Sequence, residues 1–349
     1  MLKANFLHRP MIFKHPAGTS RGVLKTKDSW FIFIRDSADE DKVGIGEVST
    51  ITGLSIDPPD KIEAELQWLC NNINSANDWI EERGQQFPAI RFGLETALLD
   101  LKSPKSHIYD DTLFTQGKSG IPINGLIWMG SQDFMQTQIE EKIAAGFKCI
   151  KIKVGAIDFE QELKILAGIR AKFNAKQIEL RLDANGAFAV HEALEKLQRL
   201  SAFDIHSIEQ PIKAGQQQEM ALLCENSPIP IALDEELIGL ESASIAALLK
   251  EINPQYVILK SGLLGGLEAA DRFIVEAEKL GIKWWATSAL ESNIGLNAIA
   301  QWVFKKQNPL PQGLGTGQLY TNNIQSPLEI KNAALFYNPA LQWENLRPK

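Results

Sequence analysis

Five charged residues recur along the middle of the chain, each at the end of a short apolar run. They are Lys153, Asp183, Glu209, Asp234 and Lys260, and the intervals between them are 30, 26, 25 and 26 residues. A (β/α)8 barrel of about 250 residues uses roughly 31 residues for each strand and helix. Each charge therefore follows its predecessor by about one such unit. The carboxyl ends of the strands share one face of a barrel, so we expect these side chains to converge there.

The three acids in this series predict a metal site. Asp183, Glu209 and Asp234 offer hard oxygen ligands with no His or Cys beside them, which suits Mg²⁺, with Mn²⁺ as a possible substitute, and argues against zinc. Without a cation, crowded carboxylates raise one another's pKa until at least one is protonated. A single such acid is more often a helix cap or a surface charge, but three in register favour a metal site.

The lysines predict a base beside that metal. Lys151 and Lys153 lie two residues apart, so they share one side of a strand, and Lys260 ends a later strand of the same barrel. An unperturbed lysine, with a pKa of about 10.4, is almost fully charged at pH 7. Nearby cations lower a lysine pKa, so we expect these lysines to be tuned for taking a proton. A lysine beside Mg²⁺ suits removal of a proton α to a carboxylate, because the metal stabilises the enediolate that forms.

The elements that must position these residues are barrel units. We predict an α/β fold, a modified TIM barrel of (β/α)7β type over residues 118–320, with an α+β capping domain over residues 1–117. Residues 321–349 are too short for another unit, and we expect them to pack back on the capping domain. The expected barrel strands are 121–129, 148–154, 178–183, 205–209, 230–234, 256–260 and 282–288, followed by an irregular, glycine-rich last unit near 310–320.

The first part of the chain reads as strands followed by helices. Alternating runs predict strands at 29–35 and 43–48, and helical spacing predicts helices at 60–69 and 88–101. The small residues before the first of these strands predict a surface loop, and we expect its segment Ala17 to Gly22 to act as a lid over the barrel mouth.

Composition excludes several classes of protein. A formal charge of −7 argues against a general nucleic-acid binder. The three cysteines are widely spaced in apolar surroundings, which favours buried thiols over a disulfide framework. No run of 18 apolar residues and no signal-peptide pattern is present in this sequence. We therefore expect a cytoplasmic enzyme with a small carboxylate substrate, and no membrane or nucleic-acid partner. The sequence does not predict the oligomeric state.

The combined motifs resemble a known family. The chain is similar to the muconate-lactonising subgroup of the enolase superfamily over nearly its whole length, including the segment 91–101 (RFGLETALLDL). The motifs that carry the resemblance are Lys151-x-Lys153, Asp183-x-Asn185, Glu209-Gln210-Pro211, Asp234-Glu235 and Lys260. A lysine at the sixth strand, without a histidine ending the seventh, argues against the mandelate-racemase branch.

Two further segments narrow the resemblance. Residues 287–295 (TSALESNIG) and 313–320 (GLGTGQLY) are similar to the o-succinylbenzoate synthase family. The resemblance implies dehydration of 2-succinyl-6-hydroxy-2,4-cyclohexadiene-1-carboxylate in menaquinone biosynthesis. Lys153 would remove the α-proton and then protonate the leaving hydroxyl, while Lys260 would stay charged and stabilise the dienolate. Lys151 would neutralise the substrate carboxylate. The resemblance also implies a supporting carboxylate beside the metal ligands, Glu235, and three further substrate contacts, Asn185, Ser288 and Gly315.

Other reactions remain open from the sequence. Racemisation of an N-acylamino acid, such as an N-succinylamino acid, would use Lys153 and Lys260 as opposed bases. Dipeptide epimerisation is disfavoured, because the segment 313–317 has no acid to hold a substrate ammonium group. A lyase that forms a Schiff base on one lysine would not need three metal-ligand carboxylates.

Overall fold

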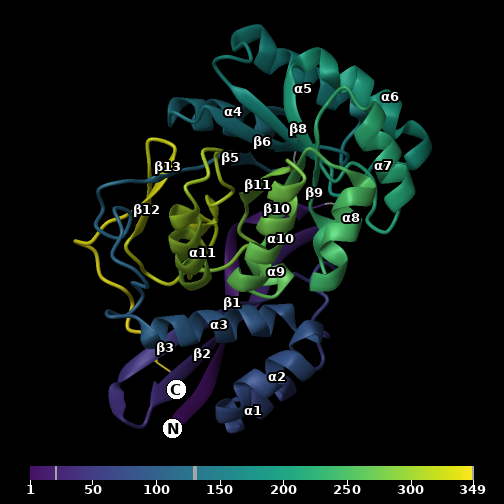
Figure 1. The fold of residues 1–349 in the computed structure, drawn as a ribbon. Coiled ribbons are helices and arrows are strands. Elements are labelled where there is room, and N and C mark those ends of the chain that lie inside the picture. The colour runs from purple at the N-terminus through teal and green to yellow at the C-terminus, as the bar shows by residue number, and fades with distance from the viewer. Residues whose placement is uncertain (20–21, 129–131, 348–349) are drawn as a thin grey trace.

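The computed structural model describes residues 1–19, 22–128 and 132–347. Figure 1 shows the cap, with its sheet and helices, below the barrel. Helix α3 lies between the cap sheet and the barrel. The elements of the cap are β1 (Leu2–Thr19), β2 (Gly22–Asp36), β3 (Asp39–Ser49), α1 (Ile62–Asn71), α2 (Ala76–Glu82) and α3 (Pro88–Lys102).

The cap sheet is antiparallel, in the order β1-β2-β3. The predicted strands and helices of this region are present, but the expected loop before the first strand is not. Pairing of β1 with β2 continues to Thr19 and Gly22, after an irregularity between Ile12 and Ala17. Pro16 is tolerated there because β1 is an edge strand, which needs fewer ladder N–H groups. The expected lid, Ala17 to Gly22, is therefore largely strand, and its residues 20 and 21 lie outside the described part of the chain.

Glycines allow α3 to approach the cap sheet closely. A Cβ atom added to Gly46 of β3 would lie 1.9 Å from the carbonyl oxygen of Gly93 in α3. Ile90, Leu94 and Ala97 of α3 are buried against Ile34 and other apolar side chains of the sheet. The helical spacing of these apolar residues thus places them on the face that packs against the sheet.

A buried acid, Asp57, lies in the loop before α1 and contacts the N-terminus of α3. One carboxylate oxygen accepts a hydrogen bond from the backbone N–H of Ala89 at 3.0 Å, and the other, Oδ2, has no partner. Burial raises the pKa of Asp57 to about 7, although the backbone N–H groups of Ala89 and Ile90 oppose the rise. The folded chain therefore holds a proton that the unfolded chain loses near pH 4.

We expect Asp57→Asn to remove a pH-dependent loss of stability. Because the folded pKa is raised, Asp57 contributes fully below pH 4, and that contribution is lost as the pH rises to about 7. The slope is at most about 1.4 kcal/mol per pH unit. Urea unfolding measures the free energy of unfolding at pH 5 and at pH 8. The difference between the two values should be about 1–3 kcal/mol smaller in Asp57→Asn than in the unmodified protein. Asp60→Asn, at an exposed position of the same loop, is the control, and an equal change in both variants would contradict this account.

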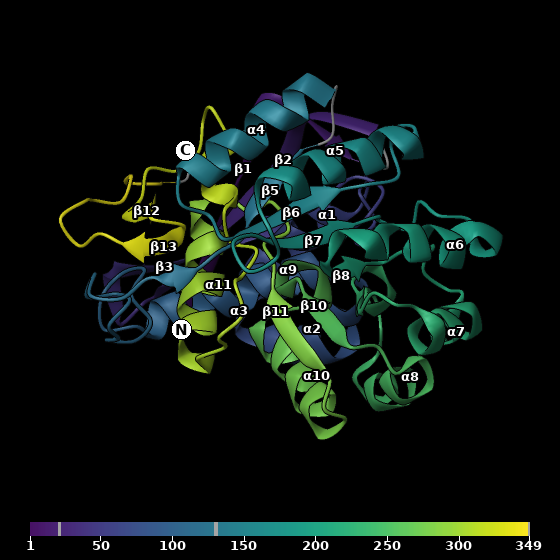
Figure 2. The ribbon, with the colours of Figure 1, turned by 90° about the horizontal axis from the view of Figure 1, so that it is seen from above.

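The barrel is a parallel sheet in the order β11-β10-β9-β8-β7-β6-β5, surrounded by a ring of helices in Figure 2. Its strands are β5 (Gly125–Ile127), β6 (Cys149–Lys153), β7 (Glu179–Asp183), β8 (Ile205–Glu209), β9 (Ile231–Leu233), β10 (Tyr256–Leu259) and β11 (Lys283–Ala286). Its helices are α4 (Gln132–Ala144), α5 (Phe159–Lys172), α6 (Val190–Leu200), α7 (Gln217–Asn226), α8 (Ile245–Ile252), α9 (Ser261–Leu264), α10 (Leu267–Lys279) and α11 (Asn293–Lys306).

Gln312 and Gly313 close the barrel in the place of an eighth strand. Gly313 donates a backbone hydrogen bond to Ala286 of β11 at 2.8 Å, and Asn124, just before β5, donates one to Gln312 at 3.0 Å. This matches the irregular last unit expected from the glycines. The first strand, predicted over residues 121–129, differs from its prediction because residues 121–127 divide between two sheets, while residue 129 lies outside the described part of the chain. Ile121–Pro122 form β4, which belongs to another sheet.

The C-terminal segment contacts both parts of the molecule. Its strands β12 (Leu328–Lys331) and β13 (Ala334–Tyr337) form a sheet with β4. Leu346 is buried with Phe31 and Phe33 of the cap sheet, and Glu344 forms an ion pair with Arg9 of β1 at 2.9 Å. The domain boundary between residues 117 and 118 stays a prediction. Within the described ranges, no helix combines the length and apolar character needed to cross a bilayer.

Candidate active site

Strand register brings the predicted residues together at one end of the barrel. Lys153 of β6 is paired with Asp183 of β7, and Asp183 is paired with Glu209 of β8. Glu209 is paired in turn with Ala232 of β9, so Asp234 lies just beyond that strand. Parallel pairing without a slip at these positions is therefore enough to line up the ends of neighbouring strands.

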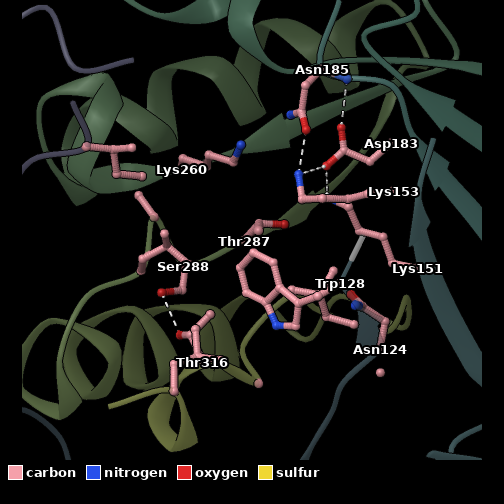
Figure 3. Close-up of a pocket in the computed structure, with 18 of the residues that line it drawn as sticks. Asn124, Trp128, Lys151, Lys153, Asp183, Asn185, Lys260, Thr287, Ser288 and Thr316 are labelled. Carbon is pink, nitrogen blue, oxygen red and sulfur yellow. Dashed lines mark hydrogen bonds and ion pairs between the residues drawn. The ribbon is translucent and has the colours of Figure 1, made fainter. Parts of the chain in front are cut away.

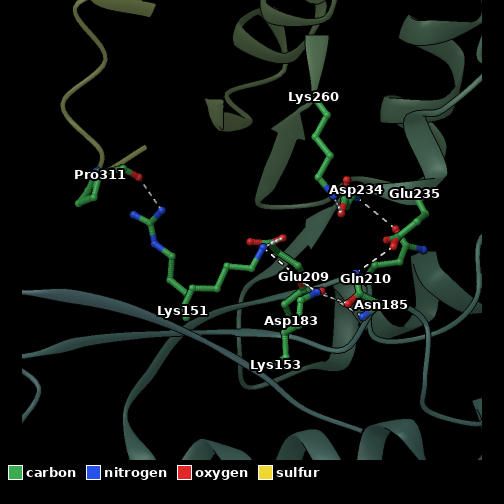
Figure 4. Close-up of polar contacts among 11 residues, drawn as sticks. Lys151, Lys153, Asp183, Asn185, Glu209, Gln210, Asp234, Glu235, Lys260 and Pro311 are labelled. Carbon is green, nitrogen blue, oxygen red and sulfur yellow. Dashed lines mark hydrogen bonds and ion pairs between the residues drawn. The ribbon is translucent and has the colours of Figure 1, made fainter. Parts of the chain in front are cut away.

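Lysines and carboxylates alternate in this cluster, as Figure 4 shows. The Nζ atom of Lys151 lies 2.9 Å from Asp183 Oδ2 and 2.5 Å from Glu209 Oε2. Lys153 Nζ lies 3.1 Å from the same Asp183 oxygen. Lys260 forms an ion pair with Asp234. The positive and negative side chains compensate one another in a site that is nearly closed to solvent.

The pKa values of the three carboxylates shift in different directions. Burial raises the pKa of Asp234 to about 7, with Lys260 opposing the rise. Burial also raises the pKa of Glu209 above its usual value, although Lys151 opposes the rise. Burial acts in the same direction on Asp183, but the neighbouring lysines outweigh it and hold its pKa well below the usual range. Burial, with a smaller contribution from the neighbouring carboxylates, thus favours a proton on Asp234 and Glu209, whereas the sequence argument named the crowding alone.

The expectation that the lysine pKa values are lowered is wrong for Lys151 and Lys260. Burial alone would lower the pKa of Lys260, but Asp234 raises it, and the result lies above the ordinary value. Burial would also lower the pKa of Lys151, but Asp183 and Glu209 raise it. The sequence argument counted neighbouring cations and expected lowered values. It did not anticipate how closely the carboxylates approach each ammonium group.

The two outer lysines face each other across a cavity of about 150 Å³. Between Lys153 on β6 and Lys260 after β10 lie the three intervening strands β7, β8 and β9, so the two side chains start from opposite sides of the barrel. In Figure 3 their Nζ atoms point toward one another. A substrate carbon held between them would have one ammonium or amine group on each face.

The donor set fits a divalent cation in its chemistry. The three acids offer only oxygen ligands, as Mg²⁺ and Mn²⁺ prefer. Glu209 Oε1 is buried and has no hydrogen-bond partner, which leaves one oxygen available to an ion. Among the described residues, no three His, Cys, Asp or Glu side chains form a ready metal-binding group, because Lys151 lies between two of the carboxylates. Binding an ion would therefore require the lysines to release these oxygens.

The remaining predicted residues lie around this cluster. Asn185 accepts a hydrogen bond from Lys153 Nζ at 2.5 Å through its Oδ1 and donates one to Glu235 Oε1 at 3.0 Å. Ser288 lines the cavity, where its hydroxyl accepts a hydrogen bond from Thr316 at 2.8 Å. Gly315 also lines the cavity. Asn185 and Glu235 therefore position the Lys153 ammonium group, while Ser288 and Gly315 belong to the wall.

Sequence reasoning did not assign roles to several cavity residues. Asn124 and Trp128 precede and follow β5, and Thr287 follows β11. Their positions at strand ends could have suggested them, but they are uncharged and no regular interval singles them out. Glu291 is a further buried acid, and Ser288 donates a hydrogen bond to its Oε2 at 2.5 Å.

The buried carboxylate of Glu47 joins the cap to the barrel. Its Oε1 accepts hydrogen bonds from the Ser29 hydroxyl at 2.8 Å and from the backbone N–H of Ser292 at 2.9 Å. Its Oε2 accepts from the Ser292 hydroxyl at 2.6 Å and from the backbone N–H of Gly295 at 3.0 Å. Ser292 and Gly295 lie at the N-terminus of α11, where a negative charge is stabilised by the helix dipole.

We expect Glu47→Gln to destabilise the fold by about 2–4 kcal/mol, because charge-assisted hydrogen bonds are lost and the Gln amide meets other donors. The free energy of unfolding in urea measures the loss. Glu268→Gln, at a position with 72% exposure, should change stability by no more than about 0.5 kcal/mol. Equal stabilities for the Glu47→Gln variant and the unmodified protein would show that this junction contributes little.

Comparisons with known proteins agree on the fold. Residues 135–337 match the family described as enolase C-terminal domain-like. The chain is 47% identical to the o-succinylbenzoate synthase of Desulfotalea psychrophila, over 96% of this chain and 98% of that protein. The crystal structure of MenC from the same organism superposes with a TM-score of 0.86 at 44% identity, covering 96% and 99% of the two chains. The Enterococcus faecalis dipeptide epimerase structure superposes with a TM-score of 0.83 at 20% identity, covering 97% of each chain.

Proposed function

The chain belongs to the enolase superfamily, and we propose that it is an o-succinylbenzoate synthase. This enzyme is a carbon–oxygen lyase that converts 2-succinyl-6-hydroxy-2,4-cyclohexadiene-1-carboxylate into o-succinylbenzoate and water. The pair of opposed lysines at the carboxylate cluster carries the assignment to proton abstraction next to a carboxylate. The 47% identity to a named o-succinylbenzoate synthase over almost the whole chain supports the choice of substrate.

The first step removes a proton from the carbon next to the ring carboxylate. Lys153, in its neutral form, is the base, and the resulting ammonium keeps the proton close to the ring. Its Nζ atom is held by Asn185 Oδ1 and Asp183 Oδ2, so the proton acceptor has a fixed direction. Lys260 stays charged on the opposite face, where its positive charge stabilises the anion that spreads over the ring.

The second step expels the hydroxyl group. The C6–O bond breaks as the electrons of the ring anion form the last double bond of the aromatic product. The Lys153 ammonium returns its proton to the departing oxygen, which leaves as water, so the lysine ends the cycle as it began. One lysine on one face therefore serves both proton transfers, and Lys260 need not exchange a proton.

A divalent metal ion is characteristic of the superfamily, and we assign Mg²⁺, with Mn²⁺ as a possible substitute. Asp183, Glu209 and Asp234 would hold it, and its charge would stabilise the negative charge that develops on the substrate carboxylate. Lys151, displaced from the acids, would neutralise that carboxylate from the side. Glu235 would support the site through its hydrogen bond from Asn185.

The direct test is incubation of the purified chain with the cyclohexadiene acid and Mg²⁺. We expect stoichiometric formation of aromatic o-succinylbenzoate. Its ultraviolet absorbance and its mass measure the product. Heat-denatured protein controls for spontaneous loss of water. Product formation no faster than in this control would contradict the proposed function.

A further inference from the structure

One wall of the cavity carries a buried amide whose hydrogen-bonding capacity is not used. Asn124 is only 5% exposed and lines the cavity. Its Oδ1 atom has no hydrogen-bond partner. A buried polar atom without a partner costs stability, so this residue type is unfavourable for folding unless something binds it.

The strand register directs Asn124 into the barrel. Leu126 of β5 is paired with Lys151 of β6, whose side chain points to the carboxylate cluster inside the barrel. Side chains two residues apart share a face of a strand, so Asn124 follows Leu126 inward. The hydrogen bond from its backbone N–H to Gln312 fixes its position beside the segment that closes the barrel.

Thr287, just after β11, carries a second polar side-chain atom of this kind. Its Oγ1 atom is also buried without a partner, and it also lines the cavity. Between it and Asn124 lies Gly313, where an added Cβ would be 2.5 Å from Thr287 Oγ1. The three residues form a row across adjacent strands, in which a residue without a side chain separates two unused polar groups.

This neutral row contrasts with the charged side of the cavity. In Figure 3, Lys153 and Lys260 lie in the upper part of the view and Asn124 in the lower part. A substrate that places a carboxylate among the lysines would present its remaining part to the neutral row. Uncharged amide and hydroxyl groups suit an uncharged acceptor, since they can donate hydrogen bonds without requiring a counter-charge.

We propose that Asn124, together with Thr287, determines specificity by hydrogen bonding to the ketone oxygen of the substrate's acyl arm. The identity of that arm rests on the proposed function. Each group would donate to the oxygen, Thr287 through its hydroxyl and Asn124 through its amide nitrogen, which a half-turn of the side-chain amide brings to the partnerless position of Oδ1. A ligand without the ketone leaves these buried groups unpaired, which is how sites of this kind reject an analogue.

The proposal predicts different effects of one substitution on ligand affinity and on stability. Replacing Asn124 by Leu, which has the same branched shape and number of side-chain heavy atoms, removes an unsatisfied polar atom, so the melting temperature should stay the same or rise. Asn297 is the matched control: it is 1% exposed and its Oδ1 also lacks a partner. Its Nδ2, however, donates to the carbonyl oxygen of His107 at 2.9 Å, and it does not line the cavity. Asn297→Leu should therefore lower the melting temperature.

The test is calorimetric binding of two ligands in the presence of Mg²⁺. One is o-succinylbenzoate, and the other is 2-(3-carboxypropyl)benzoate, in which a methylene group replaces the ketone. Asn124→Leu should weaken binding of the ketone ligand by about 3- to 30-fold and leave the second ligand within about 2-fold. Thr287→Val should give a smaller change in the same direction. Asn297→Leu should bind both ligands as the unmodified protein does.

The outcomes separate this inference from the proposed function. If Asn124→Leu and Thr287→Val lower the affinity for both ligands equally, or for neither, the two residues do not bind the ketone oxygen and the inference is wrong. If the unmodified protein fails to dehydrate the cyclohexadiene acid but prefers the ketone ligand through Asn124, the proposed function alone is wrong. Normal turnover with no ketone preference overturns the inference alone.

Discussion

Lys153→Arg is expected to lower kcat for dehydration by roughly 10²–10⁴-fold or more, the loss associated with a missing general base. Arginine keeps the positive charge near Asp183 but does not deprotonate at neutral pH. Lys260→Arg, by contrast, should retain partial activity, because the proposed mechanism asks Lys260 only for its charge. Some loss is expected there too, since the guanidinium group changes the geometry. Steady-state kinetics with the cyclohexadiene acid measures both variants.

Lys172→Arg is the control for this comparison. Lys172 is 57% exposed and pairs with Glu140 on the surface, so its replacement should leave kcat unchanged. Melting temperatures of the three variants should show that each is folded. If Lys260→Arg loses as much activity as Lys153→Arg, Lys260 exchanges a proton during the reaction and the one-base mechanism is wrong.

Removal of divalent ions should abolish turnover, and Mg²⁺ or Mn²⁺ should restore it. Asp234→Asn should weaken Mg²⁺ binding by more than about 100-fold, because even residues that merely support metal ligands are worth 10–100-fold in affinity. Calorimetric titration with Mg²⁺ gives a measurement independent of activity. The fold should persist, since the apolar barrel core includes Leu233 and Leu259 and does not depend on the ion.

Asp204→Asn is a suitable control for the metal experiment. Asp204 has a φ of 48°, a left-handed conformation that Asn tolerates, and it lies just before β8 at the opposite end of that strand from Glu209. Its replacement should leave Mg²⁺ affinity unchanged. Full activity after exhaustive chelation would refute the metal site, whatever the affinity of the variants.

Regular spacing made the barrel and its acids predictable. The charges at Asp183, Glu209 and Asp234 fall one strand–helix unit apart, and parallel strands leave little freedom in where their ends meet. The sequence also placed Lys153 and Lys260 on different strands. It could not reveal that the lysines pair directly with the carboxylates, because side-chain contacts depend on distances that spacing does not determine.

Contacts between distant segments were the least predictable part. Glu47 meets Ser292 across 245 residues of chain, and neither residue belongs to a periodic pattern. Asn124 is uncharged and lies between two short strands, so only its burial without a partner distinguishes it. The segment 15–22 is predicted as a loop because its glycines and small polar residues favour turns. Pairing with the neighbouring strand overrides that local preference.

The most direct test of the account is a comparison of two reactions in deuterated water. The purified chain with Mg²⁺ is given the cyclohexadiene acid or an N-succinyl amino acid, and product formation and deuterium at the α-carbon are followed by mass spectrometry and NMR. The account predicts rapid conversion of the cyclohexadiene acid to o-succinylbenzoate. Rapid exchange of deuterium into both enantiomers of the N-succinyl amino acid, without dehydration of the cyclohexadiene acid, would contradict it and identify a racemase.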